Sequence, residues 1–233
     1  MMADLARILA DGLRENTPKT IGVAVSGGSD SLALLHLLHG FATDHACTLH
    51  VATVDHGLRP EAAAEAEMVG DICRNLGVSH EVLHWQGWDR SGNLQNEARK
   101  ARYLLLADWG RRRQLDVIAL GHTADDQAET FLMRLARRAG VDGLSAMPQR
   151  FERNGMMWIR PLLHARRAAL QEYLTLNGIN WADDPSNDDT RYDRVRIRNA
   201  LAILEGIGVE AGALTVVAQN MTGAKEALTH QMQ

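Results

Sequence analysis

The sequence predicts an α/β protein with a doubly wound, mainly parallel sheet and a C-terminal helical extension. Short apolar runs rich in β-branched residues alternate with helical segments through the first 140 residues, which is typical of a parallel sheet covered on both faces. Polar clusters follow three of the strands, as in open α/β sheets whose ligands lie beyond the carboxyl ends. We expect one domain over residues 1–200. Residues 201–233 are predicted to add one or two helices without chemical motifs.

The expected elements follow the hydrophobic periodicity of the chain. Residues 1–16 mix acidic with apolar side chains, which predicts an amphipathic helix rather than a signal peptide. Gly77 is expected to end a helix over 61–76. Buried strands are predicted at 21–25, 48–55, 78–85 and 116–120, with an edge strand at 157–159. Further helices are predicted after residue 31 and over 94–113, 127–138 and 166–176, with polar loops at 87–92 and 183–190.

A glycine turn joins the first strand to the helix that follows it. Its residues are Ser26, Gly27, Gly28, Ser29, Asp30 and Ser31. The two glycines can adopt backbone angles closed to other residues, and they leave no Cβ in the way of a ligand. The last three residues occupy the first helical turn, where free amides and the helix dipole favour an anion, and the serine hydroxyls add donors. A tight turn with Asp30 as an ordinary helix cap is the structural alternative.

A second polar cluster, at 121–130, follows the fourth strand. His122 is expected at the strand end, where it is either structural or neutralises charge that develops on a bound phosphate. Asp125 or Asp126 is expected to cap the next helix. Asp126 and Glu129, three residues apart, are predicted to share one face of that helix. Such a carboxylate pair can bind a metal, act as acid and base, or bind an ammonium group.

Arginines predominate among the charged residues between 99 and 198, whereas acidic residues predominate before residue 99. Because guanidinium groups suit phosphate oxygens, this asymmetry favours a polyanionic partner on one face, with a solvated face of local ion pairs as the alternative. Arg99, Arg102 and Tyr103 are spaced to share one helix face. This spacing predicts either a phosphate or base platform, with the tyrosine ring available to stack on a base, or an ordinary solvated surface. Arginines recur at 191, 194, 196 and 198, directly after the acidic loop.

Composition places the chain among ordinary globular proteins. It has 233 residues and a net charge of -4, and no apolar run is long enough to cross a bilayer. Cys47 and Cys73 match no metal or redox spacing, so we expect buried thiols in a reducing compartment. The cytoplasm is the expected location. The sequence leaves the oligomeric state open, with a homodimer among the options.

The glycine turn resembles the loop of the PP-loop ATP pyrophosphatase superfamily, whose members cleave ATP between the α- and β-phosphates. Over about residues 20–200 the chain resembles the tRNA(Ile)-lysidine synthetase family. The resemblance implies an adenine nucleotide alpha hydrolase-like, Rossmann-type fold. The matching segments are 26–31, 54–59, 92–95, 97–99, 102–103, 121–130, 143–144, 160–162 and 184–198.

The resemblance implies a ligase that forms a carbon–nitrogen bond, with ATP and Mg²⁺ as cofactors. Its implied partners are free L-lysine and a tRNA(Ile) with a CAU anticodon. The C2 oxygen of the wobble cytidine is first adenylated with release of pyrophosphate, and the ε-amine of lysine then displaces AMP. The glycine turn would bind pyrophosphate, with Asp30 beside Mg²⁺, His122 near the α-phosphate, and adenine at the ends of the first two strands.

The same resemblance implies roles for the charged clusters. Asp126 and Glu129 would bind the lysine ammonium and Arg194 its carboxylate, with Arg196 as an open alternative. The residues that would hold phosphates or bases of the anticodon arm are Arg99, Arg102 and Arg160.

Three features depart from the family pattern. Residues 138–140 replace a glycine-rich turn, Val195 stands where asparagine is usual, and the chain stops soon after the catalytic region, as in a short natural form or a fragment. Two other kinds of function stay open. One is another PP-loop enzyme, either a tRNA thiolase, which needs working cysteines, or an adenylating amidation enzyme. The other is a nucleotide-binding module without catalysis.

Overall fold

The computed structural model describes residues 2–13, 18–58, 60–86, 93–183 and 193–231. Within them, six strands form one sheet in the order β3-β2-β1-β4-β6-β5, and every neighbouring pair is parallel except β5 and β6. The strands are β1 (Thr20–Ala24), β2 (Thr48–Asp55), β3 (Ser79–His84), β4 (Val117–Leu120), β5 (Arg150–Arg153) and β6 (Met156–Ile159). The prediction of a doubly wound, mainly parallel α/β fold is confirmed.

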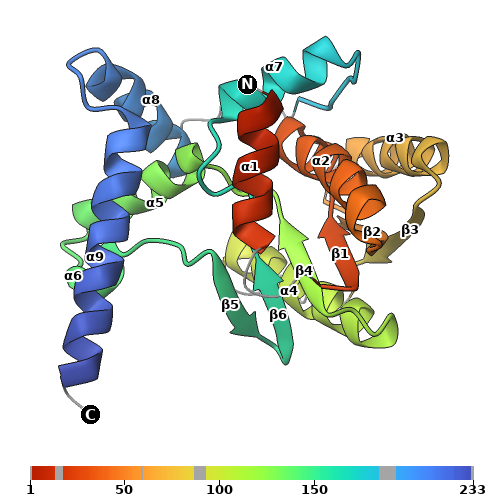
Figure 1. Cartoon of the computed structure of the whole chain (residues 1–233), viewed down its shortest axis with the longest axis horizontal. Helices are drawn as coiled ribbons and strands as arrows, with labels where there is room; N and C mark the ends of the chain where they lie inside the picture. Colours follow the sequence, from red (N-terminus) through yellow and green to blue (C-terminus); the bar gives the residue numbers. More distant parts are fainter. Residues whose placement is uncertain (1, 14–17, 59, 87–92, 184–192, 232–233) are drawn as a thin grey trace.

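Helices cover both faces of the sheet (Figure 1). Val117 of β4 lies in the larger hydrophobic core and Ile118 in the second one, because successive strand residues point to opposite faces. The larger core is enclosed by α1 (Met2–Leu13), α2 (Ser29–His45), α3 (Glu61–Leu76) and α7 (Arg167–Leu176). The second core lies beneath α4 (Leu94–Arg112). The amphipathic N-terminal helix is confirmed, since Leu5, Leu9 and Leu13 of α1 form one buried stripe.

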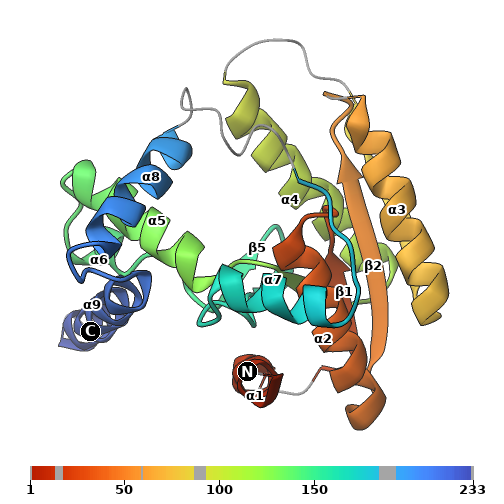
Figure 2. The same cartoon turned by 90° about the horizontal axis from the view of Figure 1, so that it is seen from above.

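Four helices lie beside the sheet instead of on its faces (Figures 1 and 2). They are α5 (Ala124–Ala136), α6 (Val141–Leu144), α8 (Asp193–Glu205) and α9 (Ala211–Gln231). They share a smaller core that includes Phe131, Leu201 and Leu214. α8 runs through residue 200, and the division of the chain into two units near that residue stays a prediction. No helix in the described part of the chain has both the length and the apolar character needed to cross a membrane.

Two expectations about the elements are wrong. Met156–Ile159 is not an edge strand, because it pairs with β4 on one side and with β5 on the other. β5 forms the edge, and sequence analysis does not predict it because Phe151 is its single apolar residue. The helix predicted over 127–138 begins earlier, at Ala124. The loops predicted at 87–92 and 183–190 lie outside the described residues, apart from Asp183.

Gly22 lies in the centre of β1, where Trp109 of α4 covers the sheet. A Cβ at this position would lie 2.5 Å from Leu115 Cδ1 and 2.7 Å from Trp109 Cζ3. Both neighbours are buried, so we expect Gly22→Ala to lower the free energy of unfolding by about 1–3 kcal/mol.

Gly40 provides the matched control for this substitution. It is exposed on α2, and a Cβ there would meet nothing within 4 Å, so Gly40→Ala should raise the free energy of unfolding by up to about 1 kcal/mol. Urea denaturation measures both variants. If Gly22→Ala were as stable as Gly40→Ala, the packing of α4 on β1 described here would be wrong.

Candidate functional site

The glycine turn, residues 26–31, leads from the central strand β1 into α2. Gly27 has a φ of 91°, a left-handed conformation that favours glycine, and its carbonyl accepts a hydrogen bond from Ala182 N at 2.9 Å. Gly28 is the N-cap of α2, and no side chain of the described residues caps the helix, so within that part of the chain its first amides are available to a ligand or solvent. The alternative in which Asp30 caps this helix is therefore wrong.

The three serines of the turn have different surroundings. Ser31 is buried, and its Oγ donates a hydrogen bond to Gly28 O at 3.0 Å and accepts one from Ser26 N at 3.2 Å. The Ser31 hydroxyl therefore holds the turn in its shape. Ser26 is exposed and Ser29 is partly buried, so their hydroxyls lie where an anion could reach them.

The turn after β4 lies directly against the glycine turn. β1 and β4 are neighbours at the point where the strand order reverses, which is where open α/β sheets bind their ligands. A Cβ on Gly121 would lie 3.0 Å from both Asp30 O and Ser31 Cα, so a larger residue would require the two turns to move apart by a few tenths of an ångström. This contact brings the start of α5 next to the start of α2.

Thr123 caps α5, so the prediction that Asp125 or Asp126 caps this helix is wrong. Thr123 Oγ1 accepts a hydrogen bond from Asp126 N at 3.3 Å, and Asp126 Oδ2 accepts one from Thr123 N at 2.9 Å. This reciprocal capping box fixes the orientation of the buried Asp126 carboxylate and leaves its second oxygen for other partners.

Asp126 and Glu129 share one face of α5, as predicted, and both bind Arg194 of α8. Arg194 Nε donates to Glu129 Oε2 at 2.6 Å, and Arg194 Nη2 donates to Asp126 Oδ1 at 2.8 Å. Arg198 Nε donates to Glu129 Oε1 at 3.0 Å, although Glu129 is only 1% exposed. Burial raises the pKa of Asp126, but the positive charges of Arg194 and Arg167 outweigh it and hold that pKa below its usual value.

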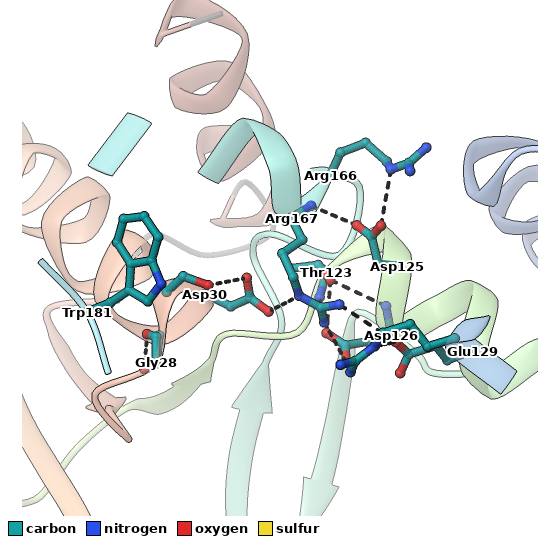
Figure 3. A network of polar contacts seen from close by, with 12 residues as sticks. Gly28, Asp30, Thr123, Asp125, Asp126, Glu129, Arg166, Arg167 and Trp181 are labelled. Atoms are coloured by element: carbon teal, nitrogen blue, oxygen red, sulfur yellow. Dashed lines mark hydrogen bonds and ion pairs between the residues drawn. The ribbon is translucent and has the colours of Figure 1, made fainter. Parts of the chain in front are cut away.

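Arg167, the first residue of α7, is a site residue that sequence analysis does not identify. Its Nε donates to Asp30 Oδ2 at 2.9 Å, and its Nη2 and Nη1 lie 3.4 Å from Asp126 Oδ1 and 3.7 Å from Glu129 Oε1 (Figure 3). Burial raises the pKa of Asp30, and the Arg167 charge opposes this shift. No spacing in the sequence distinguishes Arg167 from Arg166, so no sequence signal could have found it.

His122 lies partly buried beyond the end of β4, as predicted, and its Nδ1 accepts a hydrogen bond from Arg160 Nε at 3.3 Å. Burial lowers the pKa of His122 to about 3; Asp126 opposes this shift and the Arg160 charge adds to it. The ring is therefore neutral near pH 7, with its proton on Nε2. Arg160 is 4% exposed and lies 4.1 Å from the centroid of the Phe151 ring, so it orients His122 from the interior. The expected contact of Arg160 with tRNA stays a prediction.

The first half of α4 presents arginines but no free aromatic ring. Arg99 and Arg102 are exposed, whereas Tyr103 is 4% exposed and packs edge-to-face on Trp158 with the ring centroids 4.8 Å apart. The Arg153 guanidinium lies 4.0 Å from the Tyr103 centroid. The alternative in which Tyr103 stacks on a base is therefore wrong, because the interior of the protein occupies both its edge and its face.

Arg194 and Arg196 lie on different sides of α8, as expected for helical residues two positions apart. Arg194 faces the carboxylates, whereas Arg196 is exposed, pairs with Asp193, and lines a cavity of about 280 Å³ with Met133 and Arg137 between α5 and α8. Only Arg194 of these two therefore contacts the Asp126 and Glu129 side chains in the described structure.

The donor set at the glycine turn fits Mg²⁺ bound together with phosphate. Mg²⁺ usually takes one or two protein carboxylates and completes its octahedron with phosphate oxygens and water. Asp30 supplies one partly exposed carboxylate beside the free amides of α2. No group of three or more His, Cys, Asp or Glu side chains in the described part of the chain could hold a metal by itself.

Comparisons with known proteins agree with this geometry. A family profile described as the PP-loop domain matches residues 1–204. A tRNA(Ile)-lysidine synthase of Ruegeria pomeroyi is 52% identical over 97% of this chain and 54% of its own length. The synthase of Wolbachia pipientis wMel is 41% identical over 90% of this chain and 49% of its own length. The synthase of Rhodopseudomonas palustris is 44% identical over 89% of this chain and 61% of its own length. The chain thus spans about half the length of the curated relatives it matches.

Solved structures of distant sequence share the fold. The U34-tRNA thiolase NcsA from Methanococcus maripaludis, with its [4Fe-4S] cluster, matches with a TM-score of 0.82 at 17% identity, over 97% of this chain and 80% of that one. NMN synthetase from Francisella tularensis matches with a TM-score of 0.58 at 14% identity, over 96% of this chain and 93% of that one. The glycine turn, its place at the reversal of strand order and the profile match over residues 1–204 lead to one conclusion: the chain belongs to the PP-loop domain family.

Proposed function

We propose that this chain carries the ligase activity of a tRNA(Ile)-lysidine synthetase, and joins free lysine to C2 of the wobble cytidine of a tRNA(Ile) with a CAU anticodon. One observation carries the proposal. The Arg167 guanidinium contacts the buried carboxylates of Asp126 and Glu129 and also binds Asp30 of the glycine turn. A cation site beside a nucleotide-binding turn suits an enzyme that activates with ATP and then uses an amine. A tRNA substrate implies the cytoplasm.

In the first step, the cytidine C2 oxygen attacks the α-phosphorus of ATP, and the bond to pyrophosphate breaks. The free amides of α2 and the hydroxyls of Ser26 and Ser29 bind the pyrophosphate as its charge grows. Asp30 would hold Mg²⁺, which would supply further neutralisation of that charge. His122, which is neutral, donates a hydrogen bond from Nε2 to a phosphate oxygen.

In the second step, the ε-ammonium of lysine loses a proton to solvent. The resulting amine forms the C2–N bond as the C2–O bond breaks and AMP leaves. Free lysine brings ammonium groups and one carboxylate to the site. Asp126 and Glu129 bind an ammonium group in the place where the Arg194 guanidinium now lies. Arg194 then turns to the lysine carboxylate. After this exchange the lysine ammonium neutralises the Asp126 and Glu129 pair, and Arg194 neutralises the lysine carboxylate. The exposed Arg99 and Arg102 bind phosphates of the anticodon arm.

The two other kinds of function explain fewer of these features. A [4Fe–4S] cluster takes four cysteine ligands, whereas this chain has two cysteines. Cys73 is buried in the larger core, and Cys47 donates a hydrogen bond to Pro18 O, so neither faces the glycine turn. A nucleotide-binding module without catalysis would not need the Asp126 and Glu129 pair.

Incorporation of labelled lysine tests the proposed function directly. With ATP, Mg²⁺ and a tRNA(Ile) transcript bearing CAU, we expect one lysine per tRNA and equal amounts of AMP and pyrophosphate. A transcript with uridine at the wobble position is the control. Asp30→Asn should lower the rate of AMP formation by about 100-fold or more, because it removes the carboxylate beside the charge that develops on pyrophosphate. ATP binding by the wild type without any incorporation would instead support the nucleotide-binding module.

Glu129→Gln separates the two steps of the reaction. The substitution keeps the shape of the side chain but removes its charge, so the lysine concentration at half-maximal rate should rise by roughly 10-fold or more while adenylation stays within about threefold. Glu172→Gln, an exposed substitution of the same type on α7, is the control and should change neither step. An equal loss of both steps in Glu129→Gln would place the lysine site elsewhere.

His122 should not titrate in the functional pH range. Because its pKa is about 3, the ring stays neutral from pH 5 to 9, and His122→Asn should lower the adenylation rate without changing its pH profile. The unfolded chain protonates this histidine near its ordinary pKa, so the wild type loses stability as the pH falls below about 6. The His122→Asn variant should lose less stability than the wild type over that pH range, as measured by thermal unfolding. A wild-type ionisation near pH 6.5 that His122→Asn abolishes would contradict the neutral ring.

A further inference from the structure

Arg167 contacts carboxylates that the proposed function gives to two different substrates. Asp30 belongs to the nucleotide side of the site, and Asp126 and Glu129 belong to the lysine side. The guanidinium of Arg167 lies between them, with Nε at 2.9 Å from Asp30 Oδ2 and its two terminal nitrogens at 3.4 and 3.7 Å from Asp126 and Glu129 (Figure 3). A planar guanidinium with a fixed fork of donors can bind two oxyanions at once.

The charges around Arg167 balance when no substrate is bound. Three carboxylates contact three arginines: the acids are Asp30, Asp126 and Glu129, and the bases are Arg167, Arg194 and Arg198. A triphosphate on the glycine turn adds negative charge on the Asp30 side only. A lysine ammonium adds positive charge on the Glu129 side only. Either ligand therefore changes which oxyanions Arg167 prefers.

A hydrogen bond fixes the backbone of Arg167, whereas its side chain contacts three different carboxylates. Its amide donates to Asp125 Oδ2 at 2.7 Å, which fixes the start of α7 against the start of α5. The shortest side-chain contact is the one to Asp30, and the two to the lysine side are longer. A small shift of the guanidinium toward the glycine turn would therefore break the contacts with Asp126 and Glu129 first.

We propose that Arg167 couples nucleotide binding to lysine binding. This inference rests on the proposed function. When a triphosphate occupies the glycine turn, the Arg167 guanidinium moves onto its phosphate oxygens and leaves Asp126 and Glu129. Those carboxylates then lack one of their cations and bind the lysine ammonium more tightly. Because such coupling is reciprocal, lysine strengthens nucleotide binding by the same factor.

Equilibrium binding tests this coupling without turnover. Isothermal titration calorimetry measures the affinity for L-lysine with and without Mg²⁺ and an α,β-methylene analogue of ATP, which cannot be cleaved at the reacting bond. We expect the analogue to tighten lysine binding by at least about fivefold in the wild type. In Arg167→Gln both ligands should still bind, and the coupling factor should fall below about twofold, because no cation remains to move between the two sides.

Arg166→Gln is the matched control for this experiment. Arg166 precedes Arg167 but pairs with Asp125 and with Glu205, at 3.3 and 2.8 Å, and contacts no carboxylate of the substrate site. Its removal should leave the coupling factor at the wild-type value. If Arg167→Gln does not fold, Arg167→Lys replaces it. A single ammonium lacks the fork that spans both sides, so the coupling factor should fall at least about threefold.

The outcomes separate this inference from the proposed function. Wild-type protein that binds no lysine, with or without the analogue, overturns the proposed function. Wild-type protein that binds lysine equally well in both states overturns the coupling alone. Full coupling retained in Arg167→Gln, or in Arg167→Lys where the Gln variant is unfolded, shows that another group transmits the effect and also overturns the inference.

Discussion

The burial of Asp126 and Glu129 is the constraint on which the arrangement of this site depends. Two carboxylates next to each other on α5, one of them 1% exposed, would cost several kcal/mol each if they were left unpaired. Arg167 from α7 and Arg194 from α8 supply the compensating charge. Arg194 lies 65 residues from Glu129 in the sequence, so neutralising one pair of acids brings distant segments of the chain together.

The site lies where the sheet meets the four helices beside it, α5, α6, α8 and α9. One side of the site comes from the glycine turn after β1, and the other comes from the start of α5 and from α8 (Figure 2). The adjacency of β1 and β4 explains this position, because their carboxyl ends open at the reversal of strand order. Gly121 then permits the close contact between the two turns. The fold therefore brings the glycine turn and an acidic pair within reach of one arginine.

Interior contacts involve two residues that look functional in the sequence, and the expected contact of one of them, Arg160, with tRNA stays a prediction. Tyr103 packs against Trp158, and Arg160 is buried beside Phe151, where it orients His122. An aromatic or arginine residue at helical spacing has the same sequence signature whether it faces a ligand or a core. Burial, which depends on the sheet beneath, decides between them.

The sequence by itself determined the class of fold, the glycine turn, and the pairing of Asp126 with Glu129 on one helix face. These features depend on local periodicity, backbone permissiveness and residue spacing, all of which act over a few neighbouring positions. Only the tertiary structure decided that β6 lies inside the sheet and that Arg167 rather than Arg166 joins the site. Each of those outcomes depends on which distant side chain or strand offers a better partner, and spacing along the chain carries no record of that competition.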